Sequence, residues 1–548
     1  MGEEPVRRFG ASGAPQQAVP SRLVWFRRVL LSGATEWLAV GILMCLAAAL
    51  TEHLIGAKSL WLDEGMSARI AQLDPVDGVL ATYATPTPGA IALYYLLVHF
   101  WSAVSNTEAW LRMFSATCAV AAIPLVYMLS TRLIGRAAGL TAAIVVALSP
   151  FVVAEGQQAR PYALVILLST VLTLVFYSAM KSGGLRTWLL YATVAVAGMY
   201  VHTTVAYLVA SQGAVAGLDL ILFRRHSLPT IAARLAAAAI IVLACLPLAG
   251  QFLVPTSSGL DWIAPPTIQR ATTYLRSLTG GESLLAVTTL SVLATPLVGW
   301  SWLRRGRGLE FSILIASSVA PIVLELLVSL VRPMFLDRYL AMSVPGLALV
   351  IAAAVELLST LRPARGGAAT RRWPRPSAVI RAAACAVIVV LSLSSVGVVY
   401  GPSKEDWRGA VEMIAAEAQP GDAVVVYPGP GRVPFDYYAI RQPVFRVVTP
   451  VFPEVGWDEY FPSSGPSLEV SLSEAKHTGR VWLVYVSNVK VKESDAQLLA
   501  SYLAGGTILS RTAFIALKVE LVAFSGDAGR EAEGLSSPVP SSAISLSG

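Results

Sequence analysis

Two adjacent carboxylates, Asp63 and Glu64, are the residues whose type and position most directly suggest chemistry. They follow the apolar segment 60–62, whose tryptophan favours the membrane–water interface. A carboxylate at that depth is partly desolvated and lies close to the headgroup of any lipid substrate. The structural alternative is that Asp63 caps an interfacial helix and Glu64 interacts with the helix dipole.

Two short segments carry arginines that could hold an anion. One connects two apolar runs and contains Arg160. The other contains Arg332, Asp337 and Arg338. A guanidinium group binds phosphate through paired N–H donors, so both segments are candidate parts of a phosphate site. The structural alternatives are a membrane-surface anchor for Arg160 and an ion pair between Asp337 and Arg338.

Aromatic and histidine side chains could complete a substrate site. The segment Thr-Pro-Thr-Pro-Gly at 85–89 stiffens the chain before Tyr94 and Tyr95, which could wall a groove. His202 lies at the edge of another apolar run. The alternatives are a simple turn before an interfacial aromatic belt, and a packed, hydrogen-bonded histidine.

The composition requires membrane-spanning elements to carry these residues. Of the 548 residues, 55% are hydrophobic and 14% are charged, against about 25% charged residues in a typical soluble domain. The mean hydropathy of +0.63 excludes a soluble globular protein, and the length of the apolar runs argues against an outer-membrane barrel. The chain is therefore predicted to be a polytopic α-helical membrane protein with about eleven spans and a C-terminal soluble α/β domain. The candidate spans are 36–54, 111–131, 137–154, 162–180, 187–205, 206–223, 234–253, 284–303, 310–331, 339–360 and 378–400.

The basic residues set the expected orientation. The net charge is +7, but the arginines and lysines cluster in short loops between apolar runs, which predicts membrane orientation and no nucleic-acid partner. These loops are expected in the cytoplasm, with the N-terminus, and the acidic segments on the other side of the cytoplasmic membrane. The run 90–104 is too short to span, so it is expected to lie along the outer surface.

The same pattern predicts four parts of the chain. Residues 1–35 form a disordered cytoplasmic segment, and 36–400 form the transmembrane catalytic domain, with interfacial helices near 63–73 and 90–104 in one outer loop at 55–110. Residues 401–525 form an extracytoplasmic, or periplasmic, α/β domain and 526–548 a disordered tail. In the α/β domain, helices are predicted at 404–418 and 492–503, and strands at 422–427, 443–449, 481–487 and 507–523.

Metal and disulfide chemistry have little support. The four cysteines lie singly in apolar runs without a CxxC motif, as small buried hydrophobic residues do. Asp63 and Glu64 could hold a divalent metal, but two adjacent carboxylates do not by themselves establish a site. No cofactor is required and no metal is assigned.

At these residues the sequence resembles the GT-C glycosyltransferases, most closely family 39, which includes protein O-mannosyltransferases and the aminoarabinose transferase of lipid A. The resemblance covers roughly 36–400 and does not specify the sugar. Many relatives have His-Pro-Pro before the Tyr-Tyr helix, where this chain has the segment 85–89, so a histidine contact to substrate is not expected there. The matching residues are Leu62-Asp63-Glu64, Pro88 with Tyr94-Tyr95, Leu111-Arg112, Ser149-Pro150, Gln158-Ala159-Arg160-Pro161-Tyr162 and Asp337-Arg338-Tyr339-Leu340.

The resemblance implies inverting transfer of a hexose or pentose from a polyprenyl-phosphate donor to a hydroxyl group of a lipid, glycan or protein. Asp63 matches the catalytic carboxylate of the family, the general base, which must reach within about 3 Å of the acceptor hydroxyl. The departing phosphate gains negative charge and needs cations nearby. Arg160 and Arg338 are the first candidates for these cations, and Arg332 is the second choice. The other predicted substrate-binding residues are Glu64, Tyr94, Tyr162, His202 and Asp337.

Two other functions remain open. A lipid or glycan transporter or flippase would need ionisable residues inside its spans, and Glu325 is the main example here. A non-catalytic anchor for the C-terminal domain would need only one span, so it does not explain the eleven predicted spans.

Overall fold

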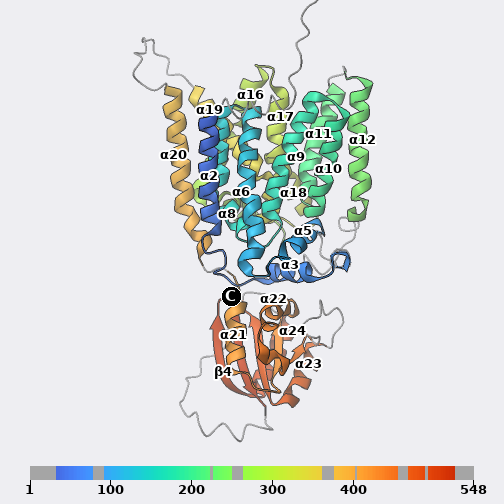
Figure 1. The fold of residues 1–548 in the computed structure, drawn as a ribbon, viewed down its shortest axis with the longest axis vertical. Helices are drawn as coiled ribbons and strands as arrows, with labels where there is room; N and C mark the ends of the chain where they lie inside the picture. Colours follow the sequence, from blue (N-terminus) through green and yellow to red (C-terminus); the bar gives the residue numbers. More distant parts are fainter. Residues whose placement is uncertain are drawn as a thin grey trace, which may run out of the picture.

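The computed structural model describes residues 33–77, 92–222, 226–249, 263–360, 376–401, 404–453, 467–487 and 492–524. A bundle of long helices forms one part of the molecule, and a small sheet domain lies beneath it (Figure 1). The expectations for the terminal segments 1–32 and 525–548, and for the Thr-Pro-Thr-Pro-Gly segment, fall outside the described residues.

The bundle confirms the predicted polytopic helical fold. In the described part of the chain, eight helices are individually long and apolar enough to cross a membrane, and two bent helix pairs raise this number to ten. The shorter apolar helix α10 (Leu185–Val201) occupies another predicted run. The eight are α2 (Ala34–Glu52), α6 (Glu108–Leu133), α9 (Tyr162–Ser182), α11 (Val205–Leu222), α12 (Leu228–Cys245) with its 3-10 extension, α15 (Glu282–Leu293) with α16 (Thr295–Leu303), η2 (Arg338–Ser343) with α19 (Val344–Thr360), and α20 (Pro376–Val396) with η3 (Gly397–Tyr400).

The bend in the first of these pairs has a local cause. α7 (Arg136–Ala147) and α8 (Pro150–Gly156) meet at 54°, where Pro150 begins α8 and the Ser149 hydroxyl accepts a hydrogen bond from Val152 N. Proline is favourable in the first turn of a helix but cannot continue a preceding one. The bend brings the segment after α8, which contains Arg160, to the lower end of the bundle. α17 (Gly308–Ser317) and α18 (Val319–Ser329) meet at 41°.

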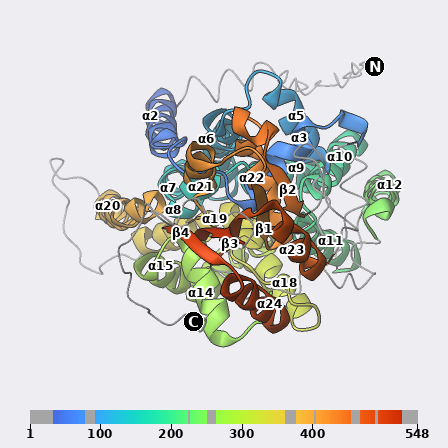
Figure 2. The same ribbon diagram turned by 90° about the horizontal axis from the view of Figure 1, so that it is seen from below.

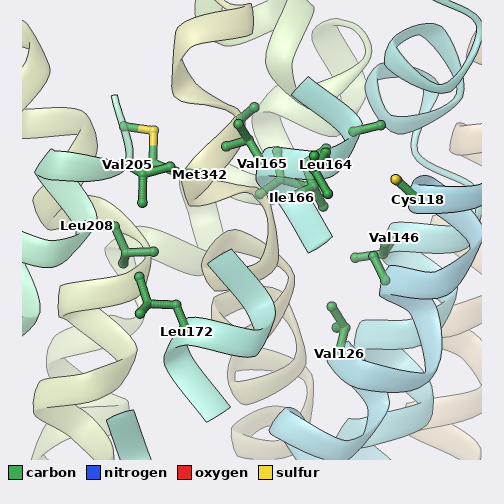
Figure 3. Close-up of a cluster of buried hydrophobic side chains, with 14 of the residues drawn as sticks. Cys118, Val126, Val146, Leu164, Val165, Ile166, Leu172, Val205, Leu208 and Met342 are labelled. Atoms are coloured by element: carbon green, nitrogen blue, oxygen red, sulfur yellow. The ribbon is translucent and has the colours of Figure 1, made fainter. Parts of the chain in front are cut away.

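Tight packing links the second bend to the start of α19. A Cβ atom on Gly346 would lie 1.9 Å from Ser317 O, so only glycine allows this approach. η2, which begins at Arg338, leads directly into α19. Figure 3 shows part of the apolar cluster around this region, where side chains from α6, α7, α9, α11 and η2 meet. Cys118 is buried in the cluster, whereas Cys45, which was predicted to be buried, is exposed on α2.

Two short helices lie between the bundle and the sheet domain (Figure 1). They are α3 (Leu62–Gln72) and α5 (Ala92–Ser102). The N-cap of α3 is Trp61 and no side chain caps it, so the alternative role of Asp63 as a helix cap is wrong. α3 buries residues at helical spacing, among them Glu64, Ala68 and Ala71.

The C-terminal domain is a five-stranded mixed sheet in the order β2-β1-β3-β5-β4. β1 pairs in parallel with β2 and β3, while β5 pairs antiparallel with β3 and β4. Helices cover both faces, which explains why β1 is apolar along its whole length. The elements are α21 (Trp407–Glu417), β1 (Ala423–Tyr427), α22 (Arg432–Ala439), β2 (Thr449–Phe452), α23 (Leu468–Ala475), β3 (Arg480–Val486), α24 (Glu493–Ala504), β4 (Thr507–Phe514) and β5 (Leu517–Ala523).

Two strand predictions in this domain are corrected. The strand expected at 443–449 is wrong, because Pro443–Arg446 forms a 3-10 turn, η5, and the strand begins only at Thr449. Phe445 packs edge-on against Phe435 there, so the apolar run fills the core without extending the sheet. The single strand expected at 507–523 is a hairpin, β4–β5.

The sheet domain is attached directly to the segment before α3. The hydroxyl of Ser59 donates to Glu405 O at 2.7 Å and accepts from Trp407 N at 3.0 Å. Leu60 N donates to the hydroxyl of Tyr438 at 2.7 Å. Seen from below, the domain covers central helices and leaves the peripheral helices α12 and α20 uncovered (Figure 2).

We expect Gly346→Ala to lower the unfolding temperature of the detergent-solubilised protein by several degrees. The added methyl group must displace the backbone at Ser317, and overpacking of this kind costs about 1–3 kcal/mol or more. Thermal unfolding followed by size-exclusion chromatography measures the change. Gly41→Ala is the matched control, because nothing lies within 4 Å of a Cβ atom there. Equal losses in the two variants would contradict this account.

Candidate active site

The carboxylate of Asp63 lies between two guanidinium groups. Its Oδ2 atom is 3.5 Å from Arg160 Nη2 and 3.8 Å from Arg338 Nη2. The three side chains come from α3, from the turn before α9 and from the start of η2. At these distances the contacts are ion pairs rather than short hydrogen bonds. Within the described residues, neither carboxylate oxygen accepts a hydrogen bond, so both retain lone pairs for a hydroxyl group. The Asp63 side chain is 24% exposed.

Arg160 is held in place by α3 and by a neighbouring ring. Its Nη1 atom donates to the backbone oxygen of Asp63 at 3.2 Å, and its guanidinium group lies 5.8 Å from the ring centre of Tyr162. Burial disfavours its charge, but the Asp63 carboxylate together with Tyr162 and Tyr95 opposes burial and keeps the pKa of Arg160 well above its usual value. The cation is therefore permanent.

Glu64 faces away from this cluster and is fully engaged by another arginine. Its two oxygens accept from Arg112 Nε at 2.8 Å and Arg112 Nη2 at 2.7 Å, and Oε1 also accepts from Ala159 N at 2.8 Å. Its side chain is 1% exposed. Burial would raise the pKa of Glu64, but Arg112 lowers it below the usual value. We infer that Glu64 positions α3; it also lines the pocket described below, so its predicted contact with substrate stays a prediction.

Arg112 uses all of its donors on α3 and on the segment that leads into it. A guanidinium group has five N–H donors. Two go to Glu64, and the other three reach the carbonyl oxygens of Ile55 and Lys58 at 2.8 Å and of Ser59 at 3.0 Å. One side chain at the start of α6 thus fixes both the approach to α3 and the first turn of α3, which contains Asp63.

His202 and Tyr162 form an aromatic group with Tyr339 beside the two arginines. The ring centres of Tyr162 and His202 are 5.3 Å apart, and those of His202 and Tyr339 are 5.2 Å apart. His202 Nδ1 lies 2.9 Å from the hydroxyl of Thr204. Burial, together with Arg160 and Arg338, lowers the pKa of His202 to about 3. The imidazole is therefore neutral at physiological pH and packs the two turns together.

The other predicted site residues form no ion pair with the Asp63 carboxylate among the described residues. Tyr94 is fully buried, with its ring centre 5.7 Å from that of Tyr95. Asp337 accepts from Arg338 N at 2.8 Å as the N-cap of η2 and also accepts from the Ser277 hydroxyl. Asp337 therefore orients Arg338 through the backbone and not through a side-chain ion pair. Among the described residues, the ion pairs of Asp63 do not include Arg332.

A pocket of about 720 Å³ opens beside Arg338. Its walls come from α8, the C-terminal end of α20, the segment before α3 and α14 (Ile268–Thr279). Two charged residues that the sequence analysis did not single out, Glu155 and Lys404, line it together with Asp337. Neither belongs to a recognisable motif, although Glu155 lies near Arg160 in the sequence.

The described residues offer no ready metal site. No group of three or more His, Cys, Asp or Glu side chains in them is placed to hold a metal ion.

Comparison with known proteins agrees with this architecture. A family model described as dolichyl-phosphate-mannose-protein mannosyltransferase matches residues 88–250, which include Tyr94, Arg160 and His202 but not Asp63. The structure of ArnT from Cupriavidus metallidurans in the apo state superposes with a TM-score of 0.55 at 12% identity, covering 89% of this chain and 98% of ArnT. The chain therefore has the fold of ArnT. The predicted resemblance to GT-C glycosyltransferases is thereby confirmed.

A second structure of the same ArnT, bound to undecaprenyl phosphate, has a TM-score of 0.51 at 11% identity and covers 90% of this chain and 99% of that one. No curated protein sequence matches the chain.

We expect Arg112→Met to destabilise the protein strongly. The change leaves the buried Glu64 carboxylate without its cation, and loss of one partner of a buried pair costs about 3–5 kcal/mol. The unfolding temperature in detergent measures this loss. Arg381→Met is the matched control, because its pair with Glu356 is about a third exposed and contributes about 1 kcal/mol or less. If both variants melt together, Arg112 does not have the role assigned to it.

Proposed function

We propose that the protein is an inverting glycosyltransferase that moves a sugar from a polyprenyl-phosphate donor to an acceptor hydroxyl at the outer face of the cytoplasmic membrane. The observation that carries the proposal is the Asp63 carboxylate between Arg160 and Arg338, beside a pocket of about 720 Å³. The fold and the family match support it, as does the undecaprenyl phosphate bound by ArnT.

The three side chains suit the bond changes of this reaction. Asp63 takes the proton of the acceptor hydroxyl while the hydroxyl oxygen attacks the anomeric carbon of the sugar. The bond between that carbon and the phosphate oxygen breaks on the opposite side, so the configuration inverts. The polyprenyl phosphate departs as a monoester with one more negative charge than the diester had. Arg160 and Arg338 stabilise that charge.

The local charge balance favours an anionic donor. Two arginines face one carboxylate, which leaves an excess of positive charge, while Glu64 and Arg112 neutralise each other. Arg338 both approaches Asp63 and lines the pocket, so it can contact the donor phosphate while the acceptor approaches Asp63. The acceptor is a hydroxyl group on a lipid, glycan or protein.

The orientation follows from the basic loops. They predict that the N-terminus is cytoplasmic and that the sheet domain, α3 and the site lie on the outer side. A donor sugar linked to a polyprenyl chain is accessible there from the membrane.

We expect Asp63→Asn to reduce sugar transfer by at least about a hundredfold, because general bases typically contribute 10²- to 10⁴-fold. Transfer is measured in membranes of a deletion strain that express each variant, with a labelled polyprenyl-phosphate sugar and mass spectrometry of the envelope glycans. Glu52→Gln, an exposed carboxylate on α2, is the control and should behave as wild type. Full transfer by Asp63→Asn would remove the mechanism, and donor-independent flux of a lipid through purified protein in liposomes would favour a flippase.

Arg160→Lys and Arg338→Lys test the phosphate-binding role. Lysine keeps the charge but lacks the paired donors of a guanidinium group. We expect kcat/KM for the donor to fall about tenfold in each variant, as for the loss of one charge-assisted hydrogen bond. Arg270→Lys, on the exposed side of α14, is the matched control. An unchanged kcat/KM in both test variants would show that neither arginine contacts the phosphate.

A further inference from the structure

Lys404 extends from the junction between the bundle and the sheet domain into the pocket beside Arg338. Its Nζ atom donates to Gln158 Oε1 at 2.8 Å and lies 3.6 Å from the ring centre of Trp61. In the described part of the chain, no carboxylate forms an ion pair with it. An ammonium group has three N–H donors, and one serves Gln158. The remaining donors are available to a ligand.

The position of Lys404 is fixed by the sheet domain. The next residue, Glu405, accepts from the Ser59 hydroxyl through its backbone oxygen, and Trp407 N donates to the same hydroxyl. Trp407 is fully buried in the core of the domain. These bonds join the backbone next to Lys404 to the segment before α3, and the hydrogen bond to Gln158 holds the ammonium group itself.

The environment of Lys404 disfavours an unliganded cation. Burial, and the nearby Arg338, lower the pKa of Lys404 to about 8, although the carboxylates of Glu64, Glu155 and Asp63 oppose the shift. A cation that is partly desolvated without an ion pair is costly in free energy. An anion that enters the pocket recovers that cost.

The pocket has the size and polarity of a site for a sugar phosphate. Its volume of about 720 Å³ lies within the range of about 300–1,000 Å³ for small-molecule sites. Lys404 and Arg338 supply positive charge, while Phe151 and Val398 supply apolar wall. Glu155 is 6% exposed, and its Oε2 atom has no hydrogen-bond partner among the described residues. This oxygen can therefore accept a hydrogen bond from a hydroxyl group of the sugar.

We propose that Lys404 binds the phosphate of the lipid donor together with Arg338, so that the sheet domain completes the donor site. This inference rests on the proposed function and adds to it a residue from outside the transmembrane domain. The sheet domain is then a structural part of the donor site, and a purely structural clamp on Trp61 and Gln158 is the competing role for Lys404.

The test compares binding of undecaprenyl phosphate and undecaprenol to the purified full-length protein. We expect Lys404→Met to bind undecaprenyl phosphate about tenfold more weakly than wild type, as for the loss of a charge-assisted hydrogen bond. Lys404→Arg should restore most of the affinity. Undecaprenol, which has no phosphate, should bind equally to all variants. Lys181→Met removes the same charge from a half-exposed lysine at the other end of α9 and should bind as wild type.

The outcomes separate the two proposals. If wild type binds undecaprenyl phosphate no better than undecaprenol, the proposed function fails. If wild type prefers the phosphate and Lys404→Met keeps that preference, the inference about Lys404 is overturned while the proposed function stands. If Lys404→Met weakens both ligands equally and melts at a lower temperature, Lys404 is a structural clamp and the inference is also overturned.

Discussion

The buried pair of Glu64 and Arg112 is the contact on which the geometry of the site depends. Arg112 donates five hydrogen bonds to four residues between Ile55 and Glu64, and Glu64 also accepts a hydrogen bond from Ala159 N. α3, the start of α6 and the turn with Arg160 therefore meet at one carboxylate. A buried ion pair often adds little net stability, because desolvation offsets the attraction. Its directional bonds nevertheless define one arrangement of the three segments.

That arrangement gives the two adjacent carboxylates, Asp63 and Glu64, unequal numbers of hydrogen bonds. Glu64 is saturated with hydrogen bonds, whereas Asp63 faces two cations at distances longer than a good hydrogen bond. Adjacent carboxylates on one helix thus have different surroundings because successive residues point about 100° apart around the axis. One side chain faces the core and anchors the helix, and the other faces the pair of guanidinium groups.

The sequence predicts the spans well because the length of an apolar run directly reflects the thickness of the bilayer. It also predicts that Asp63, Arg160 and Arg338 lie near one another, because all three are in segments that connect apolar runs at the same end of the bundle. The buried ion pair of Glu64 was not predicted, because its partner Arg112 lies 48 residues away at the start of another helix and no local sequence pattern links the two. Lys404 was missed for the same reason, as its bond to Gln158 spans 246 residues. The strand expected at 443–449 failed because an apolar run does not distinguish a strand from a buried turn.

The hydroxyl of Ser59 has a consequence for biogenesis. Its bond to Glu405 O joins residues 346 positions apart, so ribosomes finish the entire bundle before the partner segment exists. Until the sheet domain has been synthesised and has folded, the segment before α3 lacks the hydrogen bond of Ser59, and Leu60 N lacks its partner, the hydroxyl of Tyr438. The helices of the bundle can therefore be inserted before the segment that contains Asp63 has all of its contacts, and a chain truncated before the sheet domain would form the bundle without these two hydrogen bonds.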